Sequence, residues 1–80
     1  LKASWLDTPL GPMIAIADEK ALYLLEFVHR RGLEREVERL RKKTKSAIIP
    51  GHTQPIKSIE NELKMYFEGK LKEFKTPLFF

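Results

Sequence analysis

The chain has 80 residues, of which 42% are hydrophobic and 32% charged, with a formal net charge of +4 and no cysteine. This composition predicts a soluble globular protein, and the length predicts a single domain, residues 1–80, with one small core. Without cysteine the chain cannot form disulfides or thiolate metal sites, and it cannot use a sulfur nucleophile.

The sequence carries no membrane or export signal. No apolar run exceeds five residues, whereas a membrane-spanning helix needs roughly 20. The N-terminal residues show no signal-peptide pattern. We therefore expect a cytoplasmic protein with no membrane partner. Because the first residue is Leu1 rather than Met, we also expect that the chain was trimmed or cut from a longer one.

Residues 1–27 predict three short strands. Residues 1–6 alternate between apolar and polar side chains, which is the period of a half-buried strand. Pro9 and Gly11 favour a turn before the small and β-branched residues of 12–17. A polar turn then leads into the apolar run 21–27. The simplest arrangement of these strands is a three-stranded antiparallel meander.

After Gly32 the hydrophobic pattern changes to the period of a helix. Apolar side chains recur at positions i, i+4 and i+7 between charged ones and form a narrow stripe, made of Leu33, Val37 and Leu40. Residues 47–49 then predict a short extra strand or extended segment, which Pro50 and Gly51 close with a turn.

The second helix is the clearest element of the sequence. Thr53 or Gln54 caps its start, and Gly69 ends it. Pro55 lies in the first turn, where its missing N–H does no harm. Beyond this helix, Pro77 argues against a central strand, so we expect an extended segment over the core. One helix face is apolar and the opposite face polar, with Ile56, Ile59, Leu63, Tyr66 and Phe67 on the first and Lys57, Asn61, Lys64 and Glu68 on the second.

These elements predict an α+β fold, and their order is also that of ribonuclease-H-like nucleases, which hold two metal ions on clustered acids. The candidate acids are Asp7, Asp18 and Glu26. Asp7 and Asp18 fall in predicted hairpin turns, at the same end of the sheet by accident, where no strand holds them rigidly. We therefore expect no nuclease site, no metal and no cofactor.

Other catalytic motifs are absent from the sequence. His29 and His52 lie in predicted loops without a carboxylate pair at ligand spacing, so we expect two solvated side chains. The glycines form no phosphate-binding loop, and no serine lies in a nucleophile elbow.

The basic segment from Arg30 to Lys45 holds eight of the fifteen basic residues against three acids. Such a surplus of charge along a helix attracts phosphates without sequence preference. The three glutamates weaken the field, Glu38 is spaced to pair with Lys42, and no aromatic residue is interspersed to stack on bases. A solvated helix face is the simpler interpretation, and an independent nucleic-acid-binding module is the alternative. Its candidate phosphate contacts are Arg35, Arg39, Arg41, Lys42 and Lys43.

Three strings of the sequence occur in a familiar order. They are DTPLGPM at Asp7–Met13, ALYLLEF at Ala21–Phe27 and YFEGKLKEFKTPL at Tyr66–Leu78. Together they resemble the N-terminal domain of the O6-methylguanine-DNA methyltransferases of the Ada and Ogt type, also called methylated-DNA–protein-cysteine methyltransferases. The resemblance covers essentially the whole chain, and it implies a ribonuclease-H-like domain without nuclease chemistry.

In that family a C-terminal domain follows, with a DNA-binding helix-turn-helix and a P-C-H-R-V loop. The cysteine of the loop takes the alkyl group from O6-alkylguanine in DNA. This chain contains neither motif, so no catalytic residue can be carried over to it. The resemblance implies a monomeric, non-catalytic domain that supports a missing catalytic domain and reaches DNA through it. The end of the chain, FKTPLFF, would then be the connector, with interdomain contacts from Leu78, Phe79 and Phe80.

Overall fold

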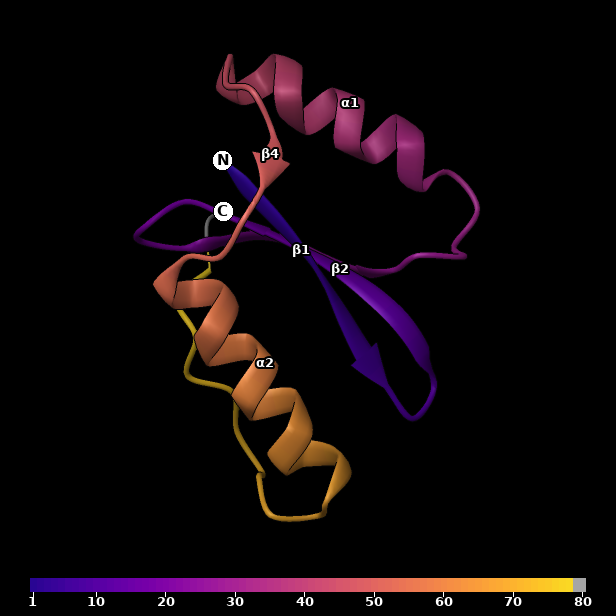
Figure 1. Cartoon of the computed structure of the whole chain (residues 1–80), viewed down its shortest axis with the longest axis vertical. Coiled ribbons are helices and arrows are strands. Elements are labelled where there is room, and N and C mark those ends of the chain that lie inside the picture. The colour runs from indigo at the N-terminus through magenta and orange to yellow at the C-terminus, as the bar shows by residue number, and fades with distance from the viewer. Residues whose placement is uncertain (79–80) are drawn as a thin grey trace.

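The computed structural model describes residues 1–78. Within this range the chain forms four strands and two helices, and the α+β fold predicted from the sequence is confirmed (Figure 1). In chain order the elements are β1 (Lys2–Thr8), β2 (Gly11–Ala17), β3 (Leu22–Phe27), α1 (Leu33–Thr44), β4 (Ile49–Pro50) and α2 (Gln54–Phe67).

The strands form one mixed sheet with the order β3-β2-β1-β4. β1, β2 and β3 are the predicted antiparallel meander, and β4 pairs in parallel with β1, where Ala3 lies opposite Pro50. The extra strand was predicted over 47–49 with Pro50 in the following turn. It starts instead at Ile49 and includes Pro50, which is tolerated because β4 is an edge strand and one side of its backbone faces no neighbour.

The hairpin between β1 and β2 is closed by two residues, Pro9 and Leu10. The N–H of Leu10 donates to the hydroxyl of Thr8 at 3.2 Å, and this hydroxyl donates to the C=O of Gly11 at 2.6 Å. Gly11 has a φ of 125°, a conformation that a side chain would strain. The string T-P-x-G is therefore explained by the closure of this turn.

A single apolar core lies between α2 and one face of the sheet. Small side chains such as Ala15, which is fully buried, let the helix approach the strands closely. The apolar face predicted for the second helix is confirmed at its three buried aliphatic positions. The buried apolar residues of this core are Leu6, Met13, Ala15, Ala17 and Leu22 from the sheet and Ile56, Ile59 and Leu63 from α2.

The helix α1 lies on the opposite side of the strands from α2 (Figure 1). Ile16 lies between Ala15 and Ala17 in β2, so its side chain points to the α1 side, where it is fully buried. No residue of α1 itself is buried. Its apolar stripe is half-buried and the rest of its surface faces solvent, as the narrow stripe predicted.

Tyr66 departs from the predicted apolar face, since it is 51% exposed. It lies on the flank of α2 that faces the C-terminal segment rather than the sheet, and its ring centroid is 5.5 Å from that of Phe74. Among residues 1–78, no helix has the length and apolar content that a membrane crossing requires.

Candidate functional site

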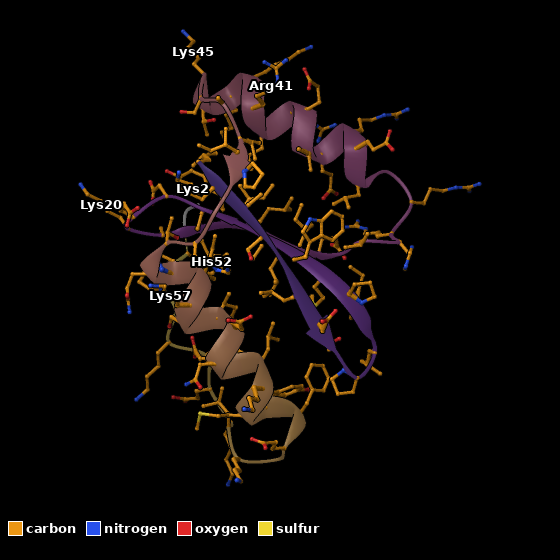
Figure 2. The ribbon with its side chains drawn as sticks, in the orientation of Figure 1. Lys2, Lys20, Arg41, Lys45, His52 and Lys57 are labelled. Carbon is orange, nitrogen blue, oxygen red and sulfur yellow. The ribbon has the colours of Figure 1, made fainter. Side chains whose placement is uncertain are left out.

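The five basic residues predicted to contact phosphates are all exposed. We call Arg35, Arg39, Arg41, Lys42 and Lys43 the basic face of α1. Figure 2 shows Arg41, and Lys45 just beyond the helix, pointing away from the sheet. The side chains that the sequence singled out therefore all lie on the solvent-exposed surface of α1.

Part of this charge is compensated within the helix. Arg41 forms an ion pair with Glu38, in which Nε donates to one carboxylate oxygen at 3.1 Å and a terminal guanidinium nitrogen donates to the other. These hydrogen bonds hold the pKa of Glu38 below its ordinary value. The pairing of Glu38 with Lys42 expected from the sequence is thus replaced by one with Arg41, because the guanidinium reaches both carboxylate oxygens.

The remaining cations of the basic face are available for other partners. Arg35, Arg39 and Lys42 lie on one ridge of α1 and form no ion pair within residues 1–78. They line a shallow groove together with Glu34 and Glu38. The interleaved glutamates weaken the positive field there, as the sequence indicated.

The start of α1 is tied to the sheet by an arginine. Arg30 forms ion pairs with Glu26 on β3 and with Glu36 on α1, the latter at 3.3 Å. Glu26 also accepts a hydrogen bond from the N–H of Phe27 at 3.0 Å. Glu26, one of the three acids considered for metal binding, therefore has a structural partner at each carboxylate oxygen.

The other two candidate acids lie far apart along the sheet. Asp7 lies within β1, opposite Pro12, rather than in a turn, and Asp18 follows the other end of β2. The prediction that Asp7 and Asp18 share one end of the sheet is therefore wrong. Successive turns of a meander alternate between the two ends, and the two-residue turn at Pro9 lets β1 continue through Asp7.

Asp18 closes the turn between β2 and β3. It accepts hydrogen bonds from the N–H groups of Lys20 and Ala21, both at 2.7 Å, and from the hydroxyl of Tyr23 at 2.8 Å. Burial raises the pKa of Asp18, but these hydrogen bonds outweigh it and lower the pKa below its ordinary value. Across the described part of the chain, no three acidic or histidine side chains come close enough to hold a metal ion.

Both histidines are exposed, as predicted. His29 lies in the turn after β3, and Nε2 of His52 lies 3.5 Å from the hydroxyl of Ser4. Among residues 1–78, neither histidine belongs to a group of side chains that could hold a metal ion.

A buried carboxylate fixes the C-terminal segment to α2. Glu62 is 8% exposed and accepts hydrogen bonds from the N–H groups of Lys75 and Thr76 and from the Thr76 hydroxyl. The hydroxyl of Ser58 lies 2.8 Å from that of Thr76. We call Ser58, Glu62, Lys75 and Thr76 the Glu62 clamp. Burial raises the pKa of Glu62, but the hydrogen bonds, above all those of Thr76 and Lys75, lower it overall.

Beyond the clamp, the chain reaches the outer edge of β3. The N–H of Leu22 donates to the C=O of Pro77 at 2.7 Å, and Leu22 forms a parallel bridge with Leu78. The segment that was predicted to lie over the core therefore runs along α2 to the edge of the sheet, and none of its residues up to Leu78 joins the core. Beside it lies a largely apolar groove of about 390 Å³, the C-terminal groove, lined by β3, Ile59, Leu63, Phe74 and Leu78.

Leu78, which was predicted as an interdomain contact, is 54% exposed, and that role stays a prediction. Phe79 and Phe80, the other two residues of that prediction, lie outside the described residues. Phe74, which was expected to cover the edge of the core, is 47% exposed.

The sequence reasoning missed the Glu62 clamp, although a signal for it exists. Glu62 lies three residues after Ile59 and four before Tyr66, on the flank of the apolar stripe of α2. An acid in that position is buried only when donors satisfy it. The donors come from a segment without regular periodicity, so its path could not be predicted.

Comparison with protein families identifies the chain. A family model described as 6-O-methylguanine DNA methyltransferase, ribonuclease-like domain, matches residues 1–80. Searches of curated proteins and of solved structures return no match. The sheet followed by two helices agrees with the domain that the family model describes. The chain therefore belongs to the family of ribonuclease-like N-terminal domains of the O6-methylguanine DNA methyltransferases, which are DNA repair proteins.

Proposed function

We propose that the chain is the non-catalytic N-terminal domain of a two-domain protein that transfers the alkyl group of O6-alkylguanine in DNA to its own cysteine. Family membership over residues 1–80, in a chain with no cysteine, is the observation that carries this proposal. Because a thiolate accepts the alkyl group, the acceptor belongs to a catalytic domain outside residues 1–80. The role of this domain is to support that catalytic domain.

The C-terminal groove supports the proposal that another domain packs here. Leu78 and Phe74 expose apolar surface next to the point where residues 1–78 end. Apolar surface of this kind is stabilised when a neighbouring domain removes it from water. The proposed protein is a cytoplasmic monomer, and it contacts DNA through the catalytic domain.

The test is to express the natural reading frame that contains residues 1–80 and to measure methyl transfer from O6-methylguanine DNA. The two-domain protein should accept one methyl group per molecule and the isolated chain none. The catalytic domain without residues 1–80 should lose thermal stability or activity. A reading frame with no cysteine-bearing domain would overturn the proposal.

A second candidate function is weak nucleic-acid binding through the basic face of α1. The unpaired ridge of Arg35, Arg39 and Lys42 is the observation that favours it. Such binding would be independent of sequence and sensitive to salt.

A further inference from the structure

The second half of β1 has an open edge. The C=O of Ala3 accepts a hydrogen bond from the N–H of Gly51 at 3.0 Å, on the side of β1 that pairs with β4. Backbone groups alternate between the two sides of a strand, so those of Trp5 and Asp7 point the same way as those of Ala3. β4 ends at Pro50, and no other strand within residues 1–78 pairs with this side of β1.

A groove of about 730 Å³ lies beside this open edge. One wall is formed by β1 and its turn, from Trp5 to Pro9, and the other by the outer flank of α2. Leu63 and Phe67 supply apolar surface to it. On the α2 wall Lys57 and Lys64 stand against Glu60 and Glu68, and Asp7 on the β1 wall adds one further negative charge.

An exposed aromatic side chain stands at the same edge. Trp5 is the only tryptophan of the chain, and it is 65% exposed. Its neighbours Ser4 and Leu6 are buried toward α2, so Trp5 projects on the opposite face of the sheet. A strand added beside β1 would place a side chain next to Trp5, because directly opposed residues on one face lie about 4.5–5.5 Å apart.

We propose that the open edge of β1 binds an extended peptide segment of a partner protein as an added strand. Unpaired N–H and C=O groups at every second residue match the backbone of another strand, and peptide recognition by strand addition uses such edges. β4 already pairs with the first half of this edge, so the added strand continues an existing ladder. Because the charges that line the groove nearly cancel and its inner side chains Leu63 and Phe67 are apolar, the partner segment alternates apolar and uncharged polar side chains.

A second copy of the chain fits this edge less well than a free peptide. If a copy of β1 paired antiparallel, with Trp5 opposite Asp7, its turn would meet Ala3. The outer side of Ala3 is already occupied by Pro50 and Gly51. A short segment of four or five residues meets no such obstacle.

The test uses the intact chain and the emission of Trp5. The probe is an acetylated and amidated pentapeptide in which valine and threonine alternate, and its control carries N-methyl groups on alternate backbone nitrogens. The unmodified peptide should shift the emission of Trp5 and the NMR amide signals of Trp5 and Asp7. Methylation should weaken binding about tenfold or more, because the hydrogen bonds to β1 are lost while the side chains stay the same.

Two substitutions of Asp7 test the same edge by altering the protein instead of the peptide. Asp7→Pro removes an outward N–H at an edge position where proline is tolerated, and it should also weaken binding about tenfold. Asp7→Asn keeps the N–H and should leave binding unchanged. If Asp7→Pro fails to fold by circular dichroism, the methylated peptide decides the question, because it leaves the protein unaltered.

Several results would overturn the proposal. They are the absence of any change at Trp5 and Asp7 with about 1 mM peptide, equal affinity of the methylated peptide, and signal changes confined to α1. If the emission of Trp5 or the amide signals of Trp5 and Asp7 shift with protein concentration in the absence of peptide, the edge binds a second copy of the chain instead.

Discussion

Glu62 is the residue on which the path of the C-terminal segment depends. A carboxylate that is nearly removed from water is costly unless donors surround it, and here two N–H groups and a hydroxyl of the following segment supply them. The clamp thereby converts residues without regular secondary structure into a fixed strap along α2. Together with the pairing of Leu22 with Pro77 and Leu78, the clamp fixes the path of residues 75–78.

Replacing Glu62 by alanine should destabilise the isolated chain by about 1–3 kcal/mol, because the buried N–H of Thr76 and the partly buried N–H of Lys75 lose their acceptor. Urea unfolding measures the loss, and limited proteolysis should show faster cleavage within residues 70–78. The matched control is Glu60→Ala on the exposed face of the same helix, which should change stability by less than about 0.5 kcal/mol. If the two substitutions lowered the free energy of unfolding equally, the stabilising role of the Glu62 clamp would be wrong.

The clamp also predicts how stability depends on pH. The folded-state pKa values of Glu62 and Asp18 are lowered, so their ionised forms favour the folded chain. This contribution is fully present above the unfolded-state pKa values, about 4.3 for Glu and 3.9 for Asp, and is lost as the pH falls through the lower folded values. The urea concentration at the unfolding midpoint should therefore decrease as the pH is lowered from about 5 into the acid range. In Glu62→Gln the fall should be smaller, and the gap between the two proteins should close in acid; a constant gap would count against this explanation.

At the scale of elements, the sequence predicted the elements that depend on local patterns but not the pairing of strands that are distant in the chain. The stripe of α2 predicted the buried contacts of Ile56, Ile59 and Leu63, because a helix on a sheet buries one face. The three strands of the meander were also predicted, because alternation and turn residues are local signals. The pairing of β4 with β1 could not be predicted, because it joins residues far apart in sequence and only two of them pair. The open edge of β1 follows from that pairing, so it was missed as well.

The basic face of α1 predicts weak, salt-dependent nucleic-acid binding, with a dissociation constant of about 10⁻⁴–10⁻⁶ M at physiological salt. Replacing the unpaired cations Arg35, Arg39 and Lys42 by Gln should weaken it further and flatten its salt dependence. The charge-matched control changes Lys20, Lys70 and Lys72, which are exposed away from α1. Fluorescence anisotropy with duplex DNA at several salt concentrations measures the affinity of each triple variant and its salt dependence. Equal losses in the two triple variants would mean that net charge alone attracts DNA, and submicromolar binding that survives high salt would make nucleic-acid binding the main function.

At the scale of the whole molecule, residues 1–78 present three surfaces that are candidates for three kinds of partner. The basic face lies on α1, the open edge of β1 faces the groove beside α2, and the C-terminal groove lies at the outer edge of β3. Only the C-terminal groove is continuous with the segment that ends the described chain. We propose this groove as the surface that the catalytic domain covers, because Phe74 and Leu78 expose apolar side chains there.

Replacing Leu78 by serine should cost the isolated chain less than about 1 kcal/mol, because its side chain is largely exposed. The comparison is Ile59→Ala in the core, which should cost about 2–5 kcal/mol. Both are measured by urea unfolding. In a two-domain protein, Leu78→Ser should also make the connector more sensitive to protease. Unfolding of the isolated chain by Leu78→Ser would place this residue in the domain's own core.

The most direct test of the central claim is methyl transfer by the isolated chain. The chain is incubated with DNA that carries a labelled methyl group on O6 of guanine, and the label on the protein is counted. Because the chain has no cysteine, the account predicts no label above that of heat-denatured protein. One methyl group per protein molecule would contradict the assignment of this domain as non-catalytic.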